Sequence, residues 1–306
     1  MCVSPGVARR AAWNRWLLMG YIYPYTIDEV CRQASALPCA PRLLPRLIEA
    51  MRDPDAAAEK IGSIILLDSG LAASTLRVVN SAAYGREMPI ADVTQAIVVL
   101  GGREIYRIAA VAMLARWEEM HQDLLPWSPG AFSRHSFSVA VAAEIVGKHV
   151  GIGDETNAYS AGLVGDIGRL SLAFLCAPAY PEIGGLVRSS HCGWEAAETK
   201  VLGYNNREIG AMLMKAWNFP PAFVTMVEFI GDPDGADESD KPFLAQMHAA
   251  RYIANSLDPQ GTPDEFLFEP HPDFLTRFGY TEQVLEQSLV DVREKTRGHF
   301  GHAVEC

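Results

Sequence analysis

Two residues that could take part in metal chemistry, His135 and Asp166, lie within the stretch Phe132–Leu170. Imidazole nitrogens and carboxylate oxygens both serve as ligands to divalent metals in hydrolytic enzymes. Such a centre needs several ligands that converge on one point, together with an open position for water. The residue before Asp166 is Gly165, which has no side chain to offer as a ligand. The chemical question is whether the remaining groups could still hold a metal.

Helical periodicity predicts the elements that carry these residues. Apolar side chains recur at helical spacing over about 131–149, 155–175 and 178–190. His135 is therefore expected in the first of these helices and Asp166 inside the second. Ser128 and Pro129 match an N-cap and a first helical position, so they predict the start of the first helix.

The rest of the chain repeats this pattern without a fixed period. Thr26 to Glu29 forms a capping-box pattern, Asp92 precedes an apolar segment that ends at Leu100, and a further helix is predicted over Lys241–Leu257. No set of alternating strands is evident. The sequence thus predicts an all-α fold of about a dozen or more short helices.

Composition excludes several classes of function. A chain of 306 residues with 49% hydrophobic residues can bury a large core, as one domain or as two joined lobes. A net charge of −11 repels phosphate backbones, and the sequence contains no basic patch, so nucleic-acid binding is not expected. Walker, Rossmann and serine-hydrolase motifs are absent from the sequence.

Cysteine usage and hydropathy suggest where the protein works. The six cysteines include no C-x-x-C pair, which predicts a reducing, cytoplasmic environment without disulfides or a thiolate zinc site. No apolar run approaches the roughly 20 residues of a membrane span. The apolar segment Trp13–Tyr25 follows basic residues, but it lacks an Ala-x-Ala cleavage site. A docking segment, or an over-long translation start with Met19 as the alternative, is therefore favoured over a signal peptide.

Three blocks of the sequence resemble HDOD, the HD-related output domain of bacterial signalling proteins. The most specific block reads Asn-Ser-Ala-Ala-Tyr-Gly and is followed by Gln-Ala-Ile and Leu-Gly. The blocks occupy residues 37–55, residues 76–85 with 95–101, and a third set made of residues 134–136, 161–170, 208–210 and 217. The resemblance extends over about residues 37–257.

The resemblance implies an HD-domain-like, multi-helix fold with an N-terminal helical lobe and a C-terminal, degenerate HD lobe. The implied divisions are an extension at 1–36, lobes at 37–125 and 126–257, and a C-terminal helical extension at 258–306. It also implies a regulatory module that binds protein partners in a bacterial signalling pathway. The oligomeric state is left open.

Mapped onto this chain, the HD ligand positions are largely lost. His135, Asp166 and His248 match ligand motifs, whereas Gly165 and Asn206 stand where the family pattern has histidines. The position of the last carboxylate ligand is Arg251. A guanidinium stays protonated and cannot bind a metal, so we expect a vestigial site without metal, cofactor or catalytic residue. Asp166 is expected to pair with Arg251 or with Arg169.

Two functions follow from these residues. The favoured one is a non-catalytic signalling module. The alternative is a divergent metal-dependent phosphohydrolase that keeps His135, Asp166 and His248 and borrows ligands from Glu195, Glu198 or Glu208.

The loop after residue 79 has two interpretations of its own. Asn80, Ser81 and Tyr84 could form a surface for a ligand or partner. They could equally end the preceding helix through local side-chain hydrogen bonds, which is the interpretation that we favour.

Overall fold

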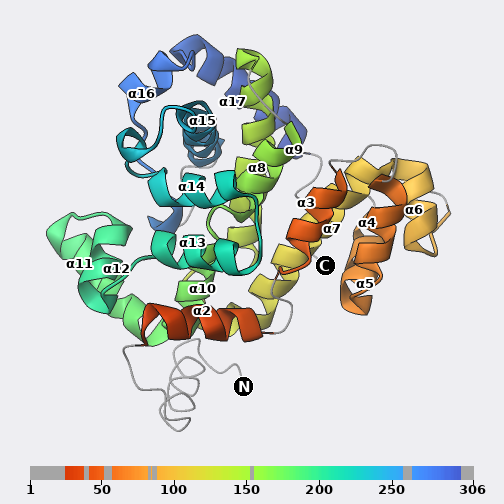
Figure 1. Cartoon of the computed structure of the whole chain (residues 1–306), viewed down its shortest axis with the longest axis horizontal. Helices are drawn as coiled ribbons and strands as arrows, with labels where there is room; N and C mark the ends of the chain where they lie inside the picture. The colour runs from red at the N-terminus through yellow and green to blue at the C-terminus, as the bar shows by residue number, and fades with distance from the viewer. Residues whose placement is uncertain are drawn as a thin grey trace, which may run out of the picture.

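The computed structural model describes residues 25–37, 41–51, 57–81, 84, 88–151, 155–257 and 264–297. These residues form helices joined by short connections and contain no strand, which confirms the all-α prediction (Figure 1). Most of the apolar segment Trp13–Tyr25 lies outside them. No single described helix is long and apolar enough to cross a membrane, although two bent helix pairs meet that test together.

The N-terminal lobe is built around one long helix, α7 (Gly102–His121). Four shorter helices pack against it: α3 (Leu44–Met51), α4 (Ala57–Ile65), α5 (Ser69–Val79) and α6 (Val93–Leu100). Asp92 caps α6 as predicted, and Gly101, with φ 84°, makes the sharp turn into α7. In Figure 1 helices α4 to α6 project away from the rest of the molecule.

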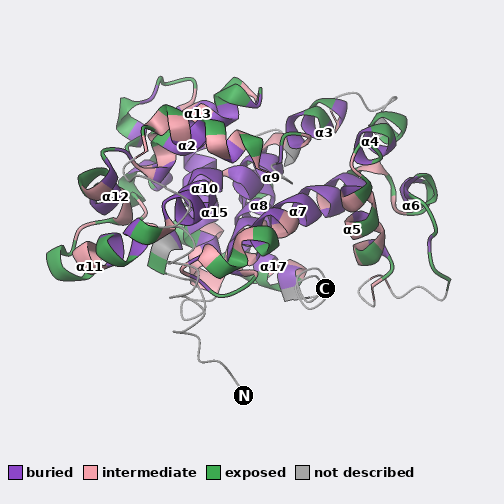
Figure 2. Cartoon of the chain, turned by 90° about the horizontal axis from the view of Figure 1, so that it is seen from below, coloured by how far each residue is buried: buried purple, intermediate pink, exposed green. Residues whose placement is uncertain are grey.

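The larger lobe is organised around α8 (Ala131–Val150). Helices α9 (Glu155–Val164), α15 (Lys241–Leu257) and α17 (Glu282–Arg297) pack directly on it. A second group is formed by α10 (Ile167–Leu175), α13 (Asn206–Ala216) and α14 (Pro221–Phe229). The pair α11 (Tyr180–Ser190) and α12 (Trp194–Leu202) and the short α16 (Pro272–Arg277) lie at the periphery (Figure 1). Figure 2 shows α8, α10 and α15 buried at the centre.

The helix α2 (Ile27–Ala36), predicted as part of an extension, packs on the larger lobe. Thr26 and Glu29 form the predicted capping box at its start. The helix lies against α10 and α13, and the indole Nε1 of Trp217 donates a hydrogen bond to Ser35 Oγ at 2.9 Å.

A buried carboxylate joins the two lobes where α7 leads into α8. The predicted cap at Ser128 and Pro129 is wrong, because α8 begins two residues later, at Ala131, with Gly130 as its N-cap. Glu118 of α7 accepts hydrogen bonds from the backbone amides of Phe132 and Ser133 at 3.1 and 3.0 Å. Its negative charge therefore satisfies the free amides at the positive end of α8.

A second buried carboxylate, Glu144 of α8, gathers cations from three helices. Its oxygens contact Arg103 and Arg107 of α7, Lys148 of α8 and Lys295 of α17. Burial alone would raise the pKa of Glu144, but Arg107 and the neighbouring ammonium groups lower it to about 2. These four cations are spread over positions 103 to 295 and meet only in the folded chain, so they form no basic patch in the sequence.

Glu144→Gln should lower the free energy of unfolding by about 2 kcal/mol, because it removes a buried charge that four partly exposed cations share. The contribution of Glu144 is fully present above its ordinary pKa of 4.5 and is lost as pH falls toward about 2. The unfolding free energies of wild type and variant, measured in urea, should therefore converge as pH falls from 4.5 toward about 2. The exposed Glu119→Gln on α7 is the control. Equal losses of unfolding free energy in Glu144→Gln and Glu119→Gln would contradict this role of Glu144.

Candidate functional site

A break between two helices places Asp166. The predicted single helix over 155–175 is two helices, because α9 ends at Val164 and α10 begins at Ile167. Asp166 occupies the N-cap position of α10 without capping it. Two residues later, a Cβ at Gly168 would lie 1.9 Å from the backbone oxygen of Asn206 on α13. Glycine is therefore required at 168 to let α10 and α13 approach closely.

The carboxylate of Asp166 lies between an arginine from α15 and a histidine from α8. Arg251 Nη2 donates to Asp166 Oδ1 at 2.8 Å, and His135 Nε2 lies 3.3 Å from Asp166 Oδ2. All three side chains are buried. Of the two predicted partners of Asp166, the structure thus shows Arg251.

The charges in this triad are arranged as a buried ion pair beside a neutral ring. Burial alone would raise the pKa of Asp166, but Arg251 and His135 hold it well below its usual range. Burial lowers the pKa of His135, and the neighbouring Asp166 offsets only part of that shift. At neutral pH the group therefore holds a carboxylate, a guanidinium and an uncharged imidazole.

Gly165 and Arg251 are physically linked. A Cβ added at Gly165 would lie 3.8 Å from Arg251 Nη1 and 3.6 Å from Met226 Cε. A larger side chain at 165 would therefore compete with the guanidinium for the same space. Arg251 therefore occupies space that a histidine side chain at 165 would need.

Arg169, the other predicted partner of Asp166, belongs to a separate network. It donates to Glu198 Oε1 at 3.0 Å and to Glu195 Oε1 at 3.1 Å. Asn206 donates its side-chain amide to Glu198 at 2.7 Å, and Arg207 donates to Glu195 at 3.2 Å. Two of the carboxylates suggested as borrowed ligands are thus held by arginines.

The third suggested ligand, Glu208, caps the helix in which it lies. It accepts a hydrogen bond from the backbone amide of Asn205 at 2.8 Å and completes a capping box at the start of α13.

His248 lies in an aromatic enclosure. Its ring contacts Phe268, His271 and Phe274 at centroid distances of 4.7, 5.4 and 5.4 Å. Burial, and then His271 and Arg251, lower the pKa of His248 to about 3. The imidazole is therefore neutral and packed like an aromatic side chain.

Aromatic residues from beyond α15 cover the site. Phe266 stacks on His135 with centroids 4.8 Å apart and rings 16° from parallel. The ring of Phe268 lies 5.2 Å from Arg251 Cζ, within the range of a cation–π contact. Neither residue was expected in the site, because both lie in the stretch 258–306 that was expected to form a C-terminal helical extension. The Phe-Leu-Phe run at 266–268 was the available signal, because it interrupts a polar stretch.

The residues present do not fit a metal. In the parts of the chain that the structure describes, no three His, Cys, Asp or Glu side chains lie close enough to hold one. The positive charge next to Asp166 is supplied by Arg251 instead.

The candidate surface at Asn80, Ser81 and Tyr84 is remote from this site and is held by local bonds. The side chain of Asn80 accepts from the amide of Ile90 at 2.7 Å and donates to its carbonyl at 2.9 Å. The Tyr84 hydroxyl donates to Glu104 Oε1 on α7 at 2.7 Å, and the Ser81 amide donates to the Val78 carbonyl. These contacts support a role in closing the loop.

Comparison with known proteins places this geometry in a family. The model of the HDOD domain matches residues 37–233. An uncharacterized protein of Treponema pallidum (strain Nichols) is 26% identical over 247 residues, which are 78% of this chain and 45% of that protein. The chain therefore spans less than half the length of this relative.

Solved structures share the fold at low identity. An HDOD domain protein of unknown function from Geobacter sulfurreducens superposes with a TM-score of 0.67 at 20% identity, covering 89% of this chain and 97% of that one. A protein from Marinobacter aquaeolei VT8, provisionally named a signal transduction protein, gives 0.68 at 18% identity, with 98% and 66% covered. A provisionally named phosphohydrolase from Shewanella amazonensis SB2B gives 0.61 at 21% identity, with 90% and 96% covered.

A double-mutant cycle tests the buried pair. Asp166→Asn and Arg251→Met should each cost about 3–5 kcal/mol of unfolding free energy, because each leaves a buried polar or charged partner uncompensated. The double variant should be less destabilised than the sum, with an interaction of at least about 2 kcal/mol. The exposed pair Arg277 and Glu238 is the control, with an expected interaction below about 1 kcal/mol. Additive losses at Asp166 and Arg251 would refute the pairing.

Proposed function

The chain belongs to the HDOD family, and on that premise we propose that it is a non-catalytic signal-transduction module of the bacterial cytoplasm that acts by binding partner proteins. The observation that carries the proposal is the 2.8 Å pair between Asp166 and Arg251. In an HD hydrolase the corresponding carboxylate would bind a divalent cation. Here a fixed organic cation compensates the same charge.

Electrostatics argue against metal-assisted hydrolysis at this position. A divalent ion beside Asp166 would have to approach the guanidinium of Arg251, and two like charges at such short range repel strongly in a buried site. Arg251 cannot lose its proton to relieve that repulsion. The ligand set is also too small, because Gly165 and Asn206 replace the nitrogen donors of the family pattern.

Packing argues in the same direction. Metal-assisted hydrolysis needs an open position for water and a path for the substrate. Phe266 stacks on His135, and Phe268 lies against Arg251, so aromatic rings occupy the surroundings of both groups. Because aromatic rings close the site, it supports a structural role for His135, Asp166 and Arg251.

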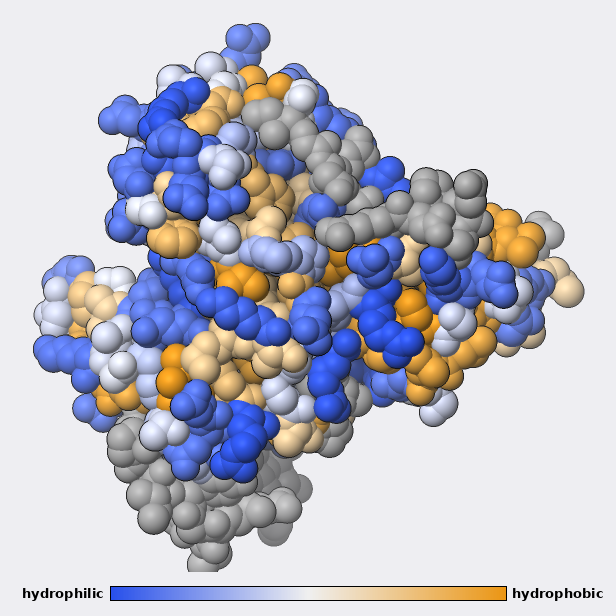
Figure 3. Space-filling model, viewed as in Figure 1, coloured by the Kyte–Doolittle hydropathy of each residue, from blue (hydrophilic) through white to orange (hydrophobic). Residues whose placement is uncertain are grey.

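The projecting N-terminal lobe offers a surface for a protein partner. Large apolar side chains are exposed after α4, at Leu66 and Leu67, and on α6, at Val98 and Val99. Figure 3 shows apolar surface over this part of the molecule. Val98 is 81% exposed, which is unusual for a valine in a helix of a packed lobe. Apolar surface of this kind is typical of protein interaction sites.

One observation favours the alternative, a divergent phosphohydrolase. His135 is held neutral beside an ionised Asp166, which is the protonation state that metal ligands need. The alternative requires Arg251 to move away and other carboxylates to take its place.

Elemental analysis of the purified protein, with phosphodiesterase and phosphatase assays on the same sample, separates the two functions. We expect clearly less than one metal ion per chain and no turnover with added Mn²⁺, Fe²⁺, Ni²⁺ or Zn²⁺, because Arg251 already neutralises Asp166. Arg251→Asp should bind more metal than wild type, since it exchanges the repelling cation for a ligand. About one metal per chain in wild type, lost in His135→Ala, would overturn the proposal.

Partner binding provides the positive test. Val98→Arg should abolish capture of the protein's partner from a bacterial lysate while leaving the unfolding temperature unchanged, because the side chain is exposed. The control is Arg103→Lys, which keeps the charge of a half-exposed residue at the start of α7. Capture that survives Val98→Arg would place the partner surface elsewhere.

A further inference from the structure

Residues 264–271 lie on the larger lobe and lead into α16, beyond the part of the chain that the family model matches. After the short turn η5 (Asp264–Phe266) they contain no helix or strand. Burial alternates along them, because Phe266 is buried, Leu267 is 56% exposed, and Phe268 is partly buried again. This alternation, with every second side chain seated on the lobe, is typical of a peptide bound in a groove.

The ring of Phe266 fits a first slot, made by three aromatic groups at the start of α8. It stacks on His135, and its centroid lies 4.9 Å from that of Trp127 and 6.1 Å from that of Phe132. Trp127 precedes the helix, and the other two residues lie in its first turns. Because all its walls are flat rings, this slot suits an aromatic side chain.

The ring of Phe268 fits a second slot, on α15. It lies over the guanidinium of Arg251, 5.2 Å from Cζ, and its centroid is 4.7 Å from that of His248. A guanidinium attracts the face of an aromatic ring, and the imidazole adds an edge-to-face contact. The two slots are therefore spaced to receive aromatic side chains two positions apart in one peptide.

Few bonds other than these ring contacts hold the segment in place. Among the described residues, one hydrogen bond joins it to the helices beneath, from Asn255 Nδ2 on α15 to the Phe266 carbonyl at 3.1 Å. The Leu267 amide donates within the segment, to the carbonyl of Asp264. The segment is thus fixed mainly by its two rings, and a ligand that offers the same two rings can take its place.

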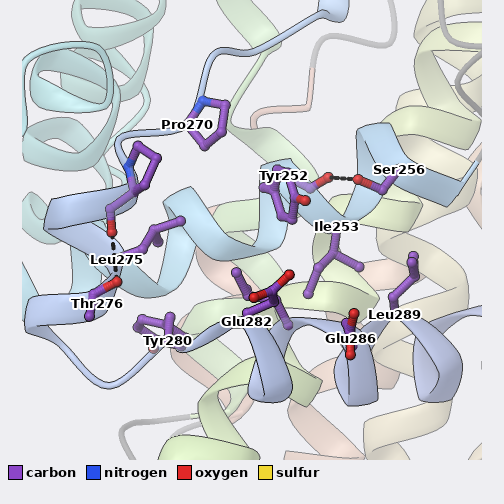
Figure 4. A pocket seen from close by; sticks show the side chains of 12 residues that line it. Tyr252, Ile253, Ser256, Pro270, Leu275, Thr276, Tyr280, Glu282, Glu286 and Leu289 are labelled. Carbon is purple, nitrogen blue, oxygen red and sulfur yellow. Dashed lines mark hydrogen bonds between the residues drawn. The ribbon is translucent and has the colours of Figure 1, made fainter.

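The end of the segment nearest α16 is not enclosed. Pro270 borders an open pocket of about 430 Å³ between α15, α16 and α17. Figure 4 shows Pro270 at the edge of this space, which Tyr252 of α15 and Leu275 of α16 also line. A segment with open space beside it can move without displacing packed side chains, so its local opening costs less than that of the core. The structure therefore leaves room for Phe268 to lift from the second slot.

The seated segment also leaves polar atoms without partners. Nε of Arg251 and Nε2 of His248 are buried beside Phe268, and neither makes a hydrogen bond among the described residues. Buried polar atoms are normally satisfied, and each one that is not destabilises the state that contains it. The closed arrangement thus gains ring packing at the second slot but lacks hydrogen bonds there, which reduces its advantage over an open arrangement.

We propose that the cleft formed by the two slots is a docking site for a peptide with the pattern aromatic-x-aromatic, and that residues 264–271 occupy it as a displaceable in-chain ligand. A partner protein that presents such a segment would replace them. The cleft lies on the larger lobe, whereas the partner surface proposed above lies on the projecting helices. The inference therefore stands whether or not that other surface binds a partner.

Binding of a fluorescent synthetic peptide to the full chain, followed by anisotropy, tests the proposal. The peptide has the sequence of residues 264–271, and a matched peptide carries alanine in place of both phenylalanines. In wild type the tethered segment competes at an effective concentration of about a millimolar, so the free peptide should bind weakly. The double variant Phe266→Ala, Phe268→Ala empties both slots and should bind it at least about tenfold more tightly. The alanine peptide should bind neither protein.

Leu267→Ala is the matched control. It removes a large apolar side chain from the same segment, but that side chain is exposed and fills neither slot. This variant should therefore bind the peptide as weakly as wild type does. A gain in Leu267→Ala equal to that of the double variant, or equal binding of the two peptides, would refute the assignment of the slots.

Loss of the buried Phe266 ring can unfold the lobe, so an unfolding temperature accompanies every titration. Phe268→Ala removes only a partly buried ring and provides a second comparison, with an expected gain of about threefold over wild type. A peptide with p-benzoylphenylalanine at its first aromatic position should cross-link to Trp127–Ser136. Absence of binding to every folded variant at about 1 mM peptide, or cross-links confined to the projecting lobe, would overturn the proposal.

Discussion

A carboxylate at the centre of a helical lobe must find a positive charge, because burying an uncompensated ion costs several kcal/mol. In this protein Arg251 supplies that charge to Asp166 at 2.8 Å, with His135 on the other side at 3.3 Å. The three groups come from α15, from the break between α9 and α10, and from α8. The packing of the larger lobe therefore depends on this one pair.

Several neighbouring features accompany the guanidinium of Arg251 beside Asp166. Gly165 leaves room beside Arg251, and Phe268 packs over the planar guanidinium. Phe266 stacks on His135 and covers one face of its ring. The part of the molecule with exposed apolar surface is the projecting helices α4 to α6.

Buried carboxylates that are paired with positive groups also hold the two lobes together. Glu118 places a buried carboxylate at the amide end of α8, and Glu144 collects cations from α7, α8 and α17. Both tie the long helix of the N-terminal lobe to the central helix of the larger one. The junction thus combines two buried carboxylates with aromatic contacts, such as that of Trp117 on α7 with Phe174 on α10.

The sequence by itself determined the all-α class, the capping box at Thr26–Glu29 and the family, because these depend on neighbouring residues and on motifs within single segments. It also restricted the partner of Asp166 to two arginines. Only the tertiary structure decided between Arg251 and Arg169, since that choice depends on how α10, α12 and α15 pack. The same holds for the cap from Glu118 and the cover from Phe266. Each joins residues far apart in the chain, whose proximity is set by core packing and not by local pattern.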